Sequence, residues 1–200
     1  MSADKTAVKQ EHILETAIRR FSHFGIQKTT MAEIAEDLAV SKPALFYYYA
    51  DKPTLIKAVE KKIVTEYIEA LNEELGPCAT VETALIKLID VKHRFLEKYH
   101  RLQLQAEQAE TLPTRPVITA ARQKLREQES ALLTRLFQKG VDTKELAPLD
   151  IPKTTGLLLD TLSAFTQSFC SKALPQPGDF TKNAQKQKAI MRIVYKGLTK

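Results

Sequence analysis

Tryptophan is absent from this chain of 200 residues, which also contains only two cysteines, six glycines and nine prolines. Cys78 and Cys170 lie far apart and lack the paired spacing of zinc ligands, so neither a disulfide framework nor a zinc site is expected. We expect no metal and no cofactor, and a redox role for the two thiols stays a minor alternative. The many Ala, Leu, Lys, Glu and Gln residues instead favour helices and predict little or no strand.

Long apolar runs are also missing, since no stretch approaches the roughly 20 apolar residues that cross a bilayer. The first ten residues, MSADKTAVKQ, are polar and lack the apolar core of a secretion signal. These observations predict a cytoplasmic protein without a membrane partner. Hydrophobic residues still make up 44% of the chain, enough for one large core or for a small and a larger domain.

The net charge of +6 permits nucleic-acid binding, but its distribution is uneven. Acidic side chains nearly match the basic ones in the first sixty residues. The excess of positive charge lies near the C-terminus, at Lys172, Lys182, Lys186, Lys188, Arg192, Lys196 and Lys200. Charge alone would therefore select the wrong end of the chain.

Helical spacing is clear in the first forty residues. One apolar stripe stops at Gly25, which predicts a first helix of about four turns with these inward positions: Leu14, Ala17, Phe21 and Phe24. Thr30 and Glu33 have the spacing of a capping box and predict the start of a short second helix. Its buried face would carry Ile34, Ala35 and Leu38.

A tight turn at residues 39–41 leads into another short helix, from Lys42 to Tyr49, with Leu45 and Tyr49 inward. Asp51 and Pro53 then mark the start of a long helix that runs to Gly76 and is suited to connecting two domains. Further helices are predicted at 81–99, 100–112, 117–139, 151–172 and 180–198. The apolar face of 151–172 is unusually broad and predicts deep core or a subunit interface, through Leu157, Leu158, Leu159, Leu162, Phe165 and Phe169.

Two short helices joined by a three-residue turn can place the second helix in a DNA major groove, which is roughly 12 Å wide. Many buried helical hairpins share this pattern, so DNA binding needs further support from the composition of the second helix. No acidic residue occurs between Val40 and Ala50. The same segment and Lys52 offer donors for phosphate oxygens or base edges, from Ser41, Lys42, Tyr47, Tyr48 and Lys52.

The segment ILETAIRRFSHFGIQKTTMAEIAEDLAVSKPALFYYYADKPTLIKAV resembles the N-terminal domain of the tetracycline-repressor (TetR) family. The shared elements, in order, are Phe21 and Gly25, the threonine pair followed by Ile34-Ala35, Val40-Ser41, Leu45-Phe46, the aromatic triplet and Lys52. The resemblance implies an all-α fold. An N-terminal three-helix helix-turn-helix domain, residues 1–52, would be joined by the long helix to a helical ligand-binding and dimerisation domain, residues 53–200.

The resemblance further implies that Thr30 and Ser41 contact phosphates and that Lys52 approaches another. It implies that the DNA major groove or its walls are contacted by Lys42, Ala44, Tyr47 and Tyr48. It also implies that the core is packed by Leu45, Phe46 and Tyr49. Two alternatives stay open: the exposed tyrosines belong partly to the core, or Thr30 and Ser41 only cap helices.

Two departures from the family pattern affect the entry to the second short helix. Ala39 stands where glycine is usual, and a left-handed backbone there would cost roughly 1 kcal/mol. Pro43 disfavours helical geometry at the preceding residue, which predicts Lys42 rather than Ser41 as N-cap.

The function implied is that of a transcriptional regulator, as a homodimeric repressor that a small-molecule effector releases from a pseudo-palindromic operator in double-stranded DNA. The candidate residues for binding this effector are His93, Glu97 and His100, spaced along one helix face, together with Thr161 and Thr166. An ordinary solvated or hydrogen-bonded role for the His-Glu-His group is the simpler interpretation. An enzyme is not expected, because no phosphate loop or nucleophile motif occurs, and a helical protein-interaction module is the remaining alternative.

Overall fold

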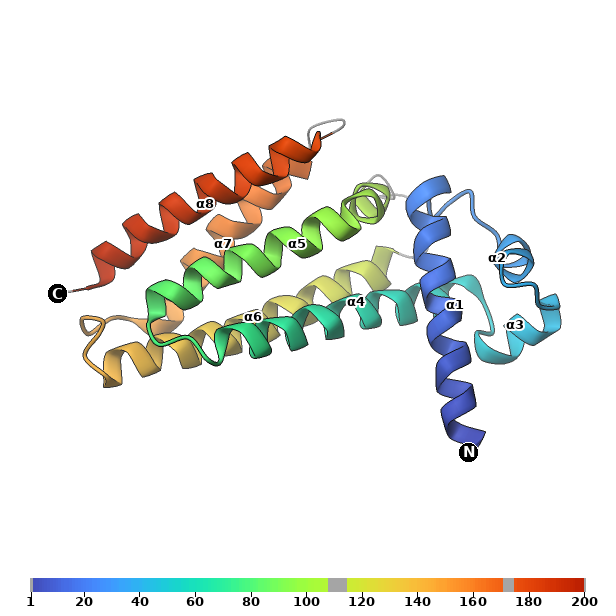
Figure 1. Ribbon diagram of the computed structural model, residues 1–200, viewed down its shortest axis with the longest axis horizontal. Helices are drawn as coiled ribbons and strands as arrows, with labels where there is room; N and C mark the ends of the chain where they lie inside the picture. Colours follow the sequence, from blue (N-terminus) through green and yellow to red (C-terminus); the bar gives the residue numbers. More distant parts are fainter. Residues whose placement is uncertain (1, 108–114, 171–174, 200) are drawn as a thin grey trace. The chain divides into compact units, whose positions relative to one another are not determined.

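A computed structural model describes residues 2–107, 115–170 and 175–199. Every regular element in these ranges is a helix, which confirms the all-α prediction (Figure 1). The helices are α1 (Ser2–Phe24), α2 (Met31–Asp37), α3 (Lys42–Tyr48), α4 (Lys52–Leu75), α5 (Val81–Glu107), α6 (Arg115–Asp142), α7 (Ile151–Cys170) and α8 (Pro177–Leu198). None of them, over the residues described, has the length and apolarity needed to cross a membrane.

The chain forms two compact units. The first contains the described residues up to Thr65 together with those between 99 and 123, and the second contains Glu66–Lys98 and the described residues from Lys124 onward. The boundary expected at residue 52 stays a prediction. Packing of the first unit extends beyond it, because Leu55 and Ile56 of α4 are buried in the same core as α1, α2 and α3.

Local signals determine the helix ends of the first unit. Gly25 has a φ of 89° directly after α1, a conformation that glycine adopts without a side-chain clash. α1 is nevertheless longer than the predicted four turns, because it begins at Ser2. Phe24 is exposed rather than inward, since the buried stripe follows Ile13, Ala17 and Phe21 and the Phe24 ring instead lies 5.0 Å from the Arg20 guanidinium.

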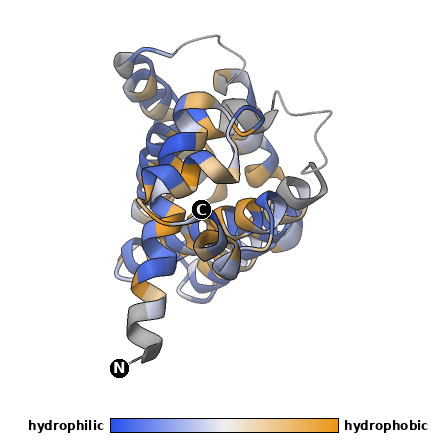
Figure 2. Cartoon of the chain, turned by 90° about the vertical axis from the view of Figure 1, so that its right-hand side faces the viewer, coloured by the Kyte–Doolittle hydropathy of each residue, from blue (hydrophilic) through white to orange (hydrophobic). Residues whose placement is uncertain are grey.

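The second unit packs α5, α6, α7, α8 and the end of α4 around one core. Most helix ribbons in Figure 2 carry both hydrophilic and hydrophobic segments, as amphipathic helices do. The break predicted between Tyr99 and His100 is wrong: α5 is continuous, because neither glycine nor proline occurs within it. Residues 108–112 and 171–172 of the predicted helices lie outside the described part of the chain.

α7 and α8 lie side by side in the second unit (Figure 1). Within one chain, only part of the broad apolar face of α7 is buried. Its buried positions are Leu158, Leu159, Leu162 and Phe169. Phe165 is only half-buried, and Leu157 is 60% exposed although it precedes two buried leucines.

A buried polar network connects three helices of the second unit. Glu129 of α6 is 6% exposed, and its Oε1 accepts a hydrogen bond from the Tyr67 hydroxyl of α4 at 2.6 Å. The same oxygen accepts a second bond from Lys92 Nζ of α5 at 2.8 Å. Burial raises the pKa of Tyr67 well above its ordinary value, so the hydroxyl remains a donor.

Candidate DNA-binding interface

The helix-turn-helix begins with the capping box that the sequence predicts. The Glu33 backbone N–H donates to Thr30 Oγ1 at 3.3 Å, while the Thr30 backbone N–H donates to Glu33 Oε2 at 2.7 Å. These bonds from Thr30 lower the pKa of Glu33, with a smaller contribution from Arg20. The Thr30 hydroxyl also donates to Glu33 Oε2, at 2.8 Å, so a phosphate would compete with a carboxylate for its proton. Its phosphate contact stays a prediction.

The turn between α2 and α3 depends on a left-handed alanine. Ala39 has a φ of 53°, as expected for a position where glycine is usual. The Ala39 N–H donates to Glu36 O at 2.9 Å, and the Val40 N–H donates to Ala35 O at 3.0 Å. These bonds close α2 and redirect the chain within three residues.

α3 begins differently from the prediction. Ser41 has extended backbone angles and caps the helix, with its Oγ accepting a hydrogen bond from the Ala44 N–H at 3.3 Å. Lys42 is the first helical residue, so its assignment as N-cap was wrong. Pro43 does not displace the serine because it occupies the first turn, where a helix needs no amide hydrogen bond from that residue.

The two faces of α3 have opposite surroundings. Leu45 and Tyr49 are buried against α1, α2 and α4, as predicted. Phe46 was expected to pack inward, but it is exposed, with Lys42 Nζ 5.8 Å from the centre of its ring. Tyr47 is 83% exposed. It therefore belongs to the surface and not to the core.

Tyr48 behaves differently from its neighbour. It is half-buried and packs against the core of the first unit. The Tyr47 and Tyr48 rings meet edge to face, with centroids 5.3 Å apart and an angle of 89° between their planes. Partial burial in the core, the alternative left open for both tyrosines, therefore applies to Tyr48 and not to Tyr47.

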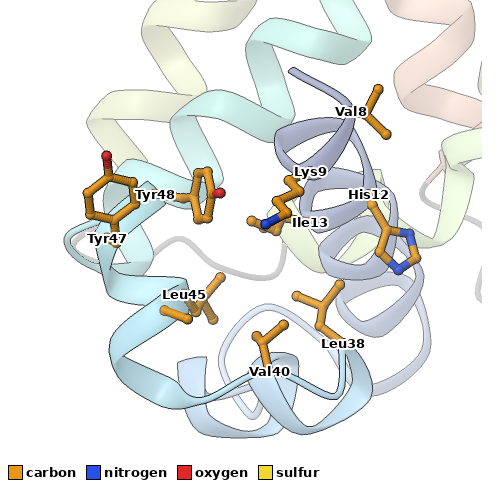
Figure 3. Close-up of a pocket in the computed structure, with 10 residues that line it drawn as sticks. Val8, Lys9, His12, Ile13, Leu38, Val40, Leu45, Tyr47 and Tyr48 are labelled. Carbon is orange, nitrogen blue, oxygen red and sulfur yellow. The ribbon is translucent and has the colours of Figure 1, made fainter. Parts of the chain in front are cut away.

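A shallow groove of about 470 Å³ lies between α1 and the turn and helix that follow α2 (Figure 3). Val40, Ala44, Tyr47 and Tyr48 line it from the α3 side. The remaining lining comes from Val8, Lys9, His12 and Ile13 of α1, and from Leu38 and Leu45. The groove is apolar, contains no carboxylate and has a lysine on its α1 side.

Lys52 occupies the start of α4, where the family resemblance places a phosphate contact. Its Nζ donates to Gln27 O at 3.1 Å, and the side chain is half-buried. Burial lowers the pKa of Lys52, and the Glu33 carboxylate partly offsets that effect. One of the three ammonium donors is used by Gln27, so contact of another with a phosphate stays a prediction.

Acidic partners neutralise two other cations of this unit. Arg20 forms ion pairs with Asp37 at 2.6 Å and with Glu33 at 3.2 Å, and Lys62 pairs with Glu11. Part of the positive charge in the N-terminal segment is thus used in ion pairs within the protein, so net charge does not reveal which of its cations face outward. Arg20 orders the helix-turn-helix, whereas Lys9 and Lys42 lie beside the exposed face of α3.

The candidate effector-binding residues lie outside the helix-turn-helix segment of the sequence. Among the described residues, no group of three possible metal ligands occurs, so His93, Glu97 and His100 do not form such a cluster. His93 is buried, Glu97 is exposed and His100 is half-buried. The hydroxyls of Thr161 and Thr166 donate to carbonyl oxygens of their own helix, at 2.8 and 3.0 Å. Their roles in binding an effector stay predictions.

Sequence reasoning missed Gln187. This α8 residue is 1% exposed, and neither polar atom of its amide has a hydrogen-bond partner in the described structure. It lies close enough to His93 to oppose the lowering of the histidine pKa by burial. The signal in the sequence was its position one helical turn before Met191, on the buried face of α8.

Comparison with known proteins gives consistent results. Residues 13–59 match the family model described as bacterial regulatory proteins, tetR family. The HTH-type transcriptional regulator RutR of Escherichia coli K12 is 28% identical over 151 residues, covering 72% of this chain and 67% of the relative. The HTH-type transcriptional repressor AcnR of Corynebacterium glutamicum is 25% identical over 122 residues, covering 60% of this chain and 58% of that protein.

Solved structures show the same fold over nearly the whole chain. A transcriptional regulator from Cytophaga hutchinsonii superposes with a TM-score of 0.82 at 23% identity, covering 96% of this chain and 99% of that structure. The fatty acid degradation regulator FadR from Bacillus halodurans gives a TM-score of 0.72 at 15% identity, over 90% of this chain and 96% of the other. At these identities the structures establish the architecture alone.

Proposed function

This chain belongs to the tetR family of bacterial regulatory proteins, and we propose that it is a homodimeric repressor released from a pseudo-palindromic operator by a small molecule. It is a helix-turn-helix DNA-binding transcriptional regulator. Repression, the form of the operator, the dimer and the effector are the proposed parts. Relatives named as repressors, including AcnR, support the first of these.

The exposed face of α3 is the observation that carries the assignment of DNA contact. A tyrosine that leaves 83% of its surface in water gains little from folding, although the opposite face of the same short helix is fully packed. Such an arrangement suits a helix that inserts into a major groove. We assign base or backbone contacts to Lys42, Ala44, Tyr47 and Tyr48, and phosphate contacts to Thr30, Ser41 and Lys52.

The operator assignment is tested with full-length protein and DNA from upstream of its own gene and the adjacent genes. We expect a band shift whose affinity falls about a thousandfold between roughly 50 and 200 mM salt, for about six phosphate contacts. A protein-interaction module would show no such salt dependence. No shift at low salt with any of these fragments would contradict the proposal.

Substitution of the exposed tyrosine tests the site itself. Tyr47→Ala should weaken binding to the preferred fragment by about 1 to 3 kcal/mol while leaving nonspecific binding nearly unchanged. Phe24→Ala is the matched control, because Phe24 is also an exposed aromatic of the first unit but lies at the end of α1. Full sequence preference in the Tyr47→Ala variant would remove this residue from the reading surface.

A second copy of the chain is the proposed partner for α7 and α8. Leu157 of α7 is 60% exposed and Ile193 of α8 is 70% exposed, and no other large apolar side chain is as exposed in the described part of the second unit. Small exposed residues, Ala164 and Ala189, occur on the same helices and permit close helix approach. Burying this face against its symmetry mate would hold two reading helices about one DNA turn apart, roughly 34 Å.

Charge insertion tests the dimer. Leu157→Glu combined with Ile193→Glu should shift the sedimentation mass toward the monomer and reduce operator affinity, because one α3 reads too few base pairs. Thr134→Glu places the same charge on the exposed side of α6 and should leave the mass unchanged. A double variant that stays dimeric would exclude this face as the interface.

The effector is proposed to bind in the second unit near His93 and Gln187. Both side chains are buried, and the His93 Nδ1 and the Gln187 amide have unused hydrogen-bonding capacity in the described structure. A small molecule with a polar group would form hydrogen bonds with both side chains. To release the operator, it must bind more tightly to the protein conformation that does not bind DNA than to the one that does. His93→Phe and Gln187→Leu should retain operator binding and lose release by whichever compound relieves repression in a reporter strain; an unchanged response would exclude this pair.

A further inference from the structure

Apart from Lys42, the recognition helix lacks the side chains that usually identify bases by paired hydrogen bonds. From Lys42 to Tyr48 the sequence is KPALFYY, without arginine, asparagine or glutamine. Arginine and lysine recognise guanine, and asparagine and glutamine recognise adenine, through two contacts to one base edge. Only Lys42 and the tyrosine hydroxyls remain as donors on this helix. Much of the sequence preference must therefore come from another type of contact.

The exposed face of the recognition helix is largely apolar. Val40, Ala44 and Tyr47 are all exposed, and all three line the groove between α1 and α3 (Figure 3). These three residues form a continuous set, which we call the apolar reading surface. Ala44 and Tyr47 lie three residues apart in α3 and share one helix face, and Val40, in the turn before α3, adjoins them in the lining of the groove.

The thymine 5-methyl group is the apolar feature that the four bases present in the major groove. We propose that the apolar reading surface recognises thymine methyl groups in each half-site of the operator. This inference rests on the proposed function and names the chemical feature that its DNA-binding site reads. Tyr47, with the largest exposed area of the three residues, supplies the principal contact.

The charges around the surface favour a DNA duplex as the occupant over an apolar peptide or a second protein. No acidic residue occurs between Val40 and Ala50, and the groove is lined by Lys9 and His12 on its α1 side. Lys42 Nζ lies above the Phe46 ring at the beginning of α3. The ammonium groups of Lys9 and Lys42 beside the apolar reading surface suit DNA, where phosphates flank the thymine methyl groups of the major groove.

The expected effect is modest and measurable. Burying one methyl group changes a dissociation constant by about fourfold at 25 °C. Two thymines in each of two half-sites would then change affinity by about 200-fold if all four methyl groups were fully buried. Replacing thymine with deoxyuridine removes this methyl group and leaves the base-pairing edge unchanged, so the effect is attributable to the methyl.

The experiment begins with selection of preferred duplexes from a random-sequence pool by the full-length protein. Each thymine of the selected duplex is then replaced in turn by deoxyuridine, and Kd is measured by fluorescence anisotropy at one salt concentration. We expect at least one position in each half-site where the replacement weakens binding three- to fivefold. Replacements outside the half-sites serve as controls and should change Kd by less than a factor of 1.5.

Variants connect the methyl effect to the residues. In Tyr47→Ala the thymine-to-deoxyuridine ratio should fall toward one at the sensitive position, whereas Tyr47→Phe should keep it because the ring remains. Val40→Ala should reduce the ratio at a neighbouring position. Lys42→Ala should weaken thymine and deoxyuridine duplexes by the same factor. Circular dichroism and melting of each variant verify that the exposed substitutions leave the fold intact.

The outcomes separate this inference from the proposed function. Failure to select any duplex with salt-dependent affinity would overturn both. Selection of a duplex whose half-sites contain no sensitive thymine would overturn the methyl reading and leave the regulator assignment in place. Persistence of the full thymine preference in both Tyr47→Ala and Val40→Ala would likewise overturn it, because the methyl groups would then be read by other residues.

Discussion

Removing the carboxylate of Glu129 should destabilise the second unit more than any exposed substitution. Its Oε1 is the shared acceptor for the Tyr67 hydroxyl and Lys92 Nζ, at 2.6 and 2.8 Å. Glu129→Leu leaves a buried phenol without an acceptor and an ammonium without its counter-ion. Breaking a buried ion pair from one side costs about 3 to 5 kcal/mol. The Lys92 side chain is 17% exposed and retains some water, so we expect the lower end, about 3 kcal/mol.

Companion variants divide this loss into its parts. Tyr67→Phe removes one hydrogen bond to a charged group and should cost about 1.5 kcal/mol. The triple variant Tyr67→Phe, Lys92→Met, Glu129→Leu has no unpaired polar group left at this position. It should therefore be more stable than Glu129→Leu alone, although it carries more substitutions.

Urea unfolding at fixed protein concentration, followed by far-UV circular dichroism, measures these differences in the free energy of unfolding. For a chain of this size, the loss in Glu129→Leu corresponds to a decrease in Tm of about 6 to 12 °C. A loss below about 1 kcal/mol would show that the network is not effectively buried. A triple variant less stable than Glu129→Leu would refute the argument that unpaired polar groups cause the loss.

Three further predictions follow from backbone geometry and burial. Ala39→Gly should raise the free energy of unfolding by about 1 kcal/mol, since the φ of 53° is strained for alanine; urea unfolding measures it, and a decrease would contradict it. Gly25→Ala should lower that free energy by about 1 to 2 kcal/mol at a φ of 89°, by the same assay, and an unchanged value would contradict the argument. Burial lowers the pKa of His93, so the unfolded state binds more protons near and below pH 6.5. Stability should consequently fall as pH decreases from 7 to 5, and His93→Gln should show a smaller decrease; equal pH profiles would exclude His93 as the cause.

The helix ends of the first unit were predictable because short-range interactions specify them. The capping box uses Thr30 and Glu33, and the Asp51 carboxylate accepts from the Thr54 N–H at 2.7 Å at the start of α4. Gly25 ends α1 through its own backbone freedom. Each of these signals involves residues within a few positions of one another, so no knowledge of packing was needed.

Predictions about which side chains point inward were less successful. Phe24 and Phe46 had suitable helical positions, yet both are exposed. Periodicity shows that a helix has an apolar side, but neighbouring helices determine how wide the buried sector is. The break predicted between residues 99 and 100 was also wrong, since α5 contains neither glycine nor proline to end it.

The sequence by itself determined the all-helical architecture, the helix-turn-helix and the similarity to the tetR family, because these depend on the order and spacing of caps, turns and apolar positions. Tertiary structure alone decided the roles of two chemically identical neighbours: Tyr47 projects into solvent, while Tyr48 packs against the core. It also brought Gln187 to His93 from more than 90 positions away in the chain. Short-range interactions specify the backbone conformation, whereas the contacts of a side chain depend on helices that come together only when the chain folds.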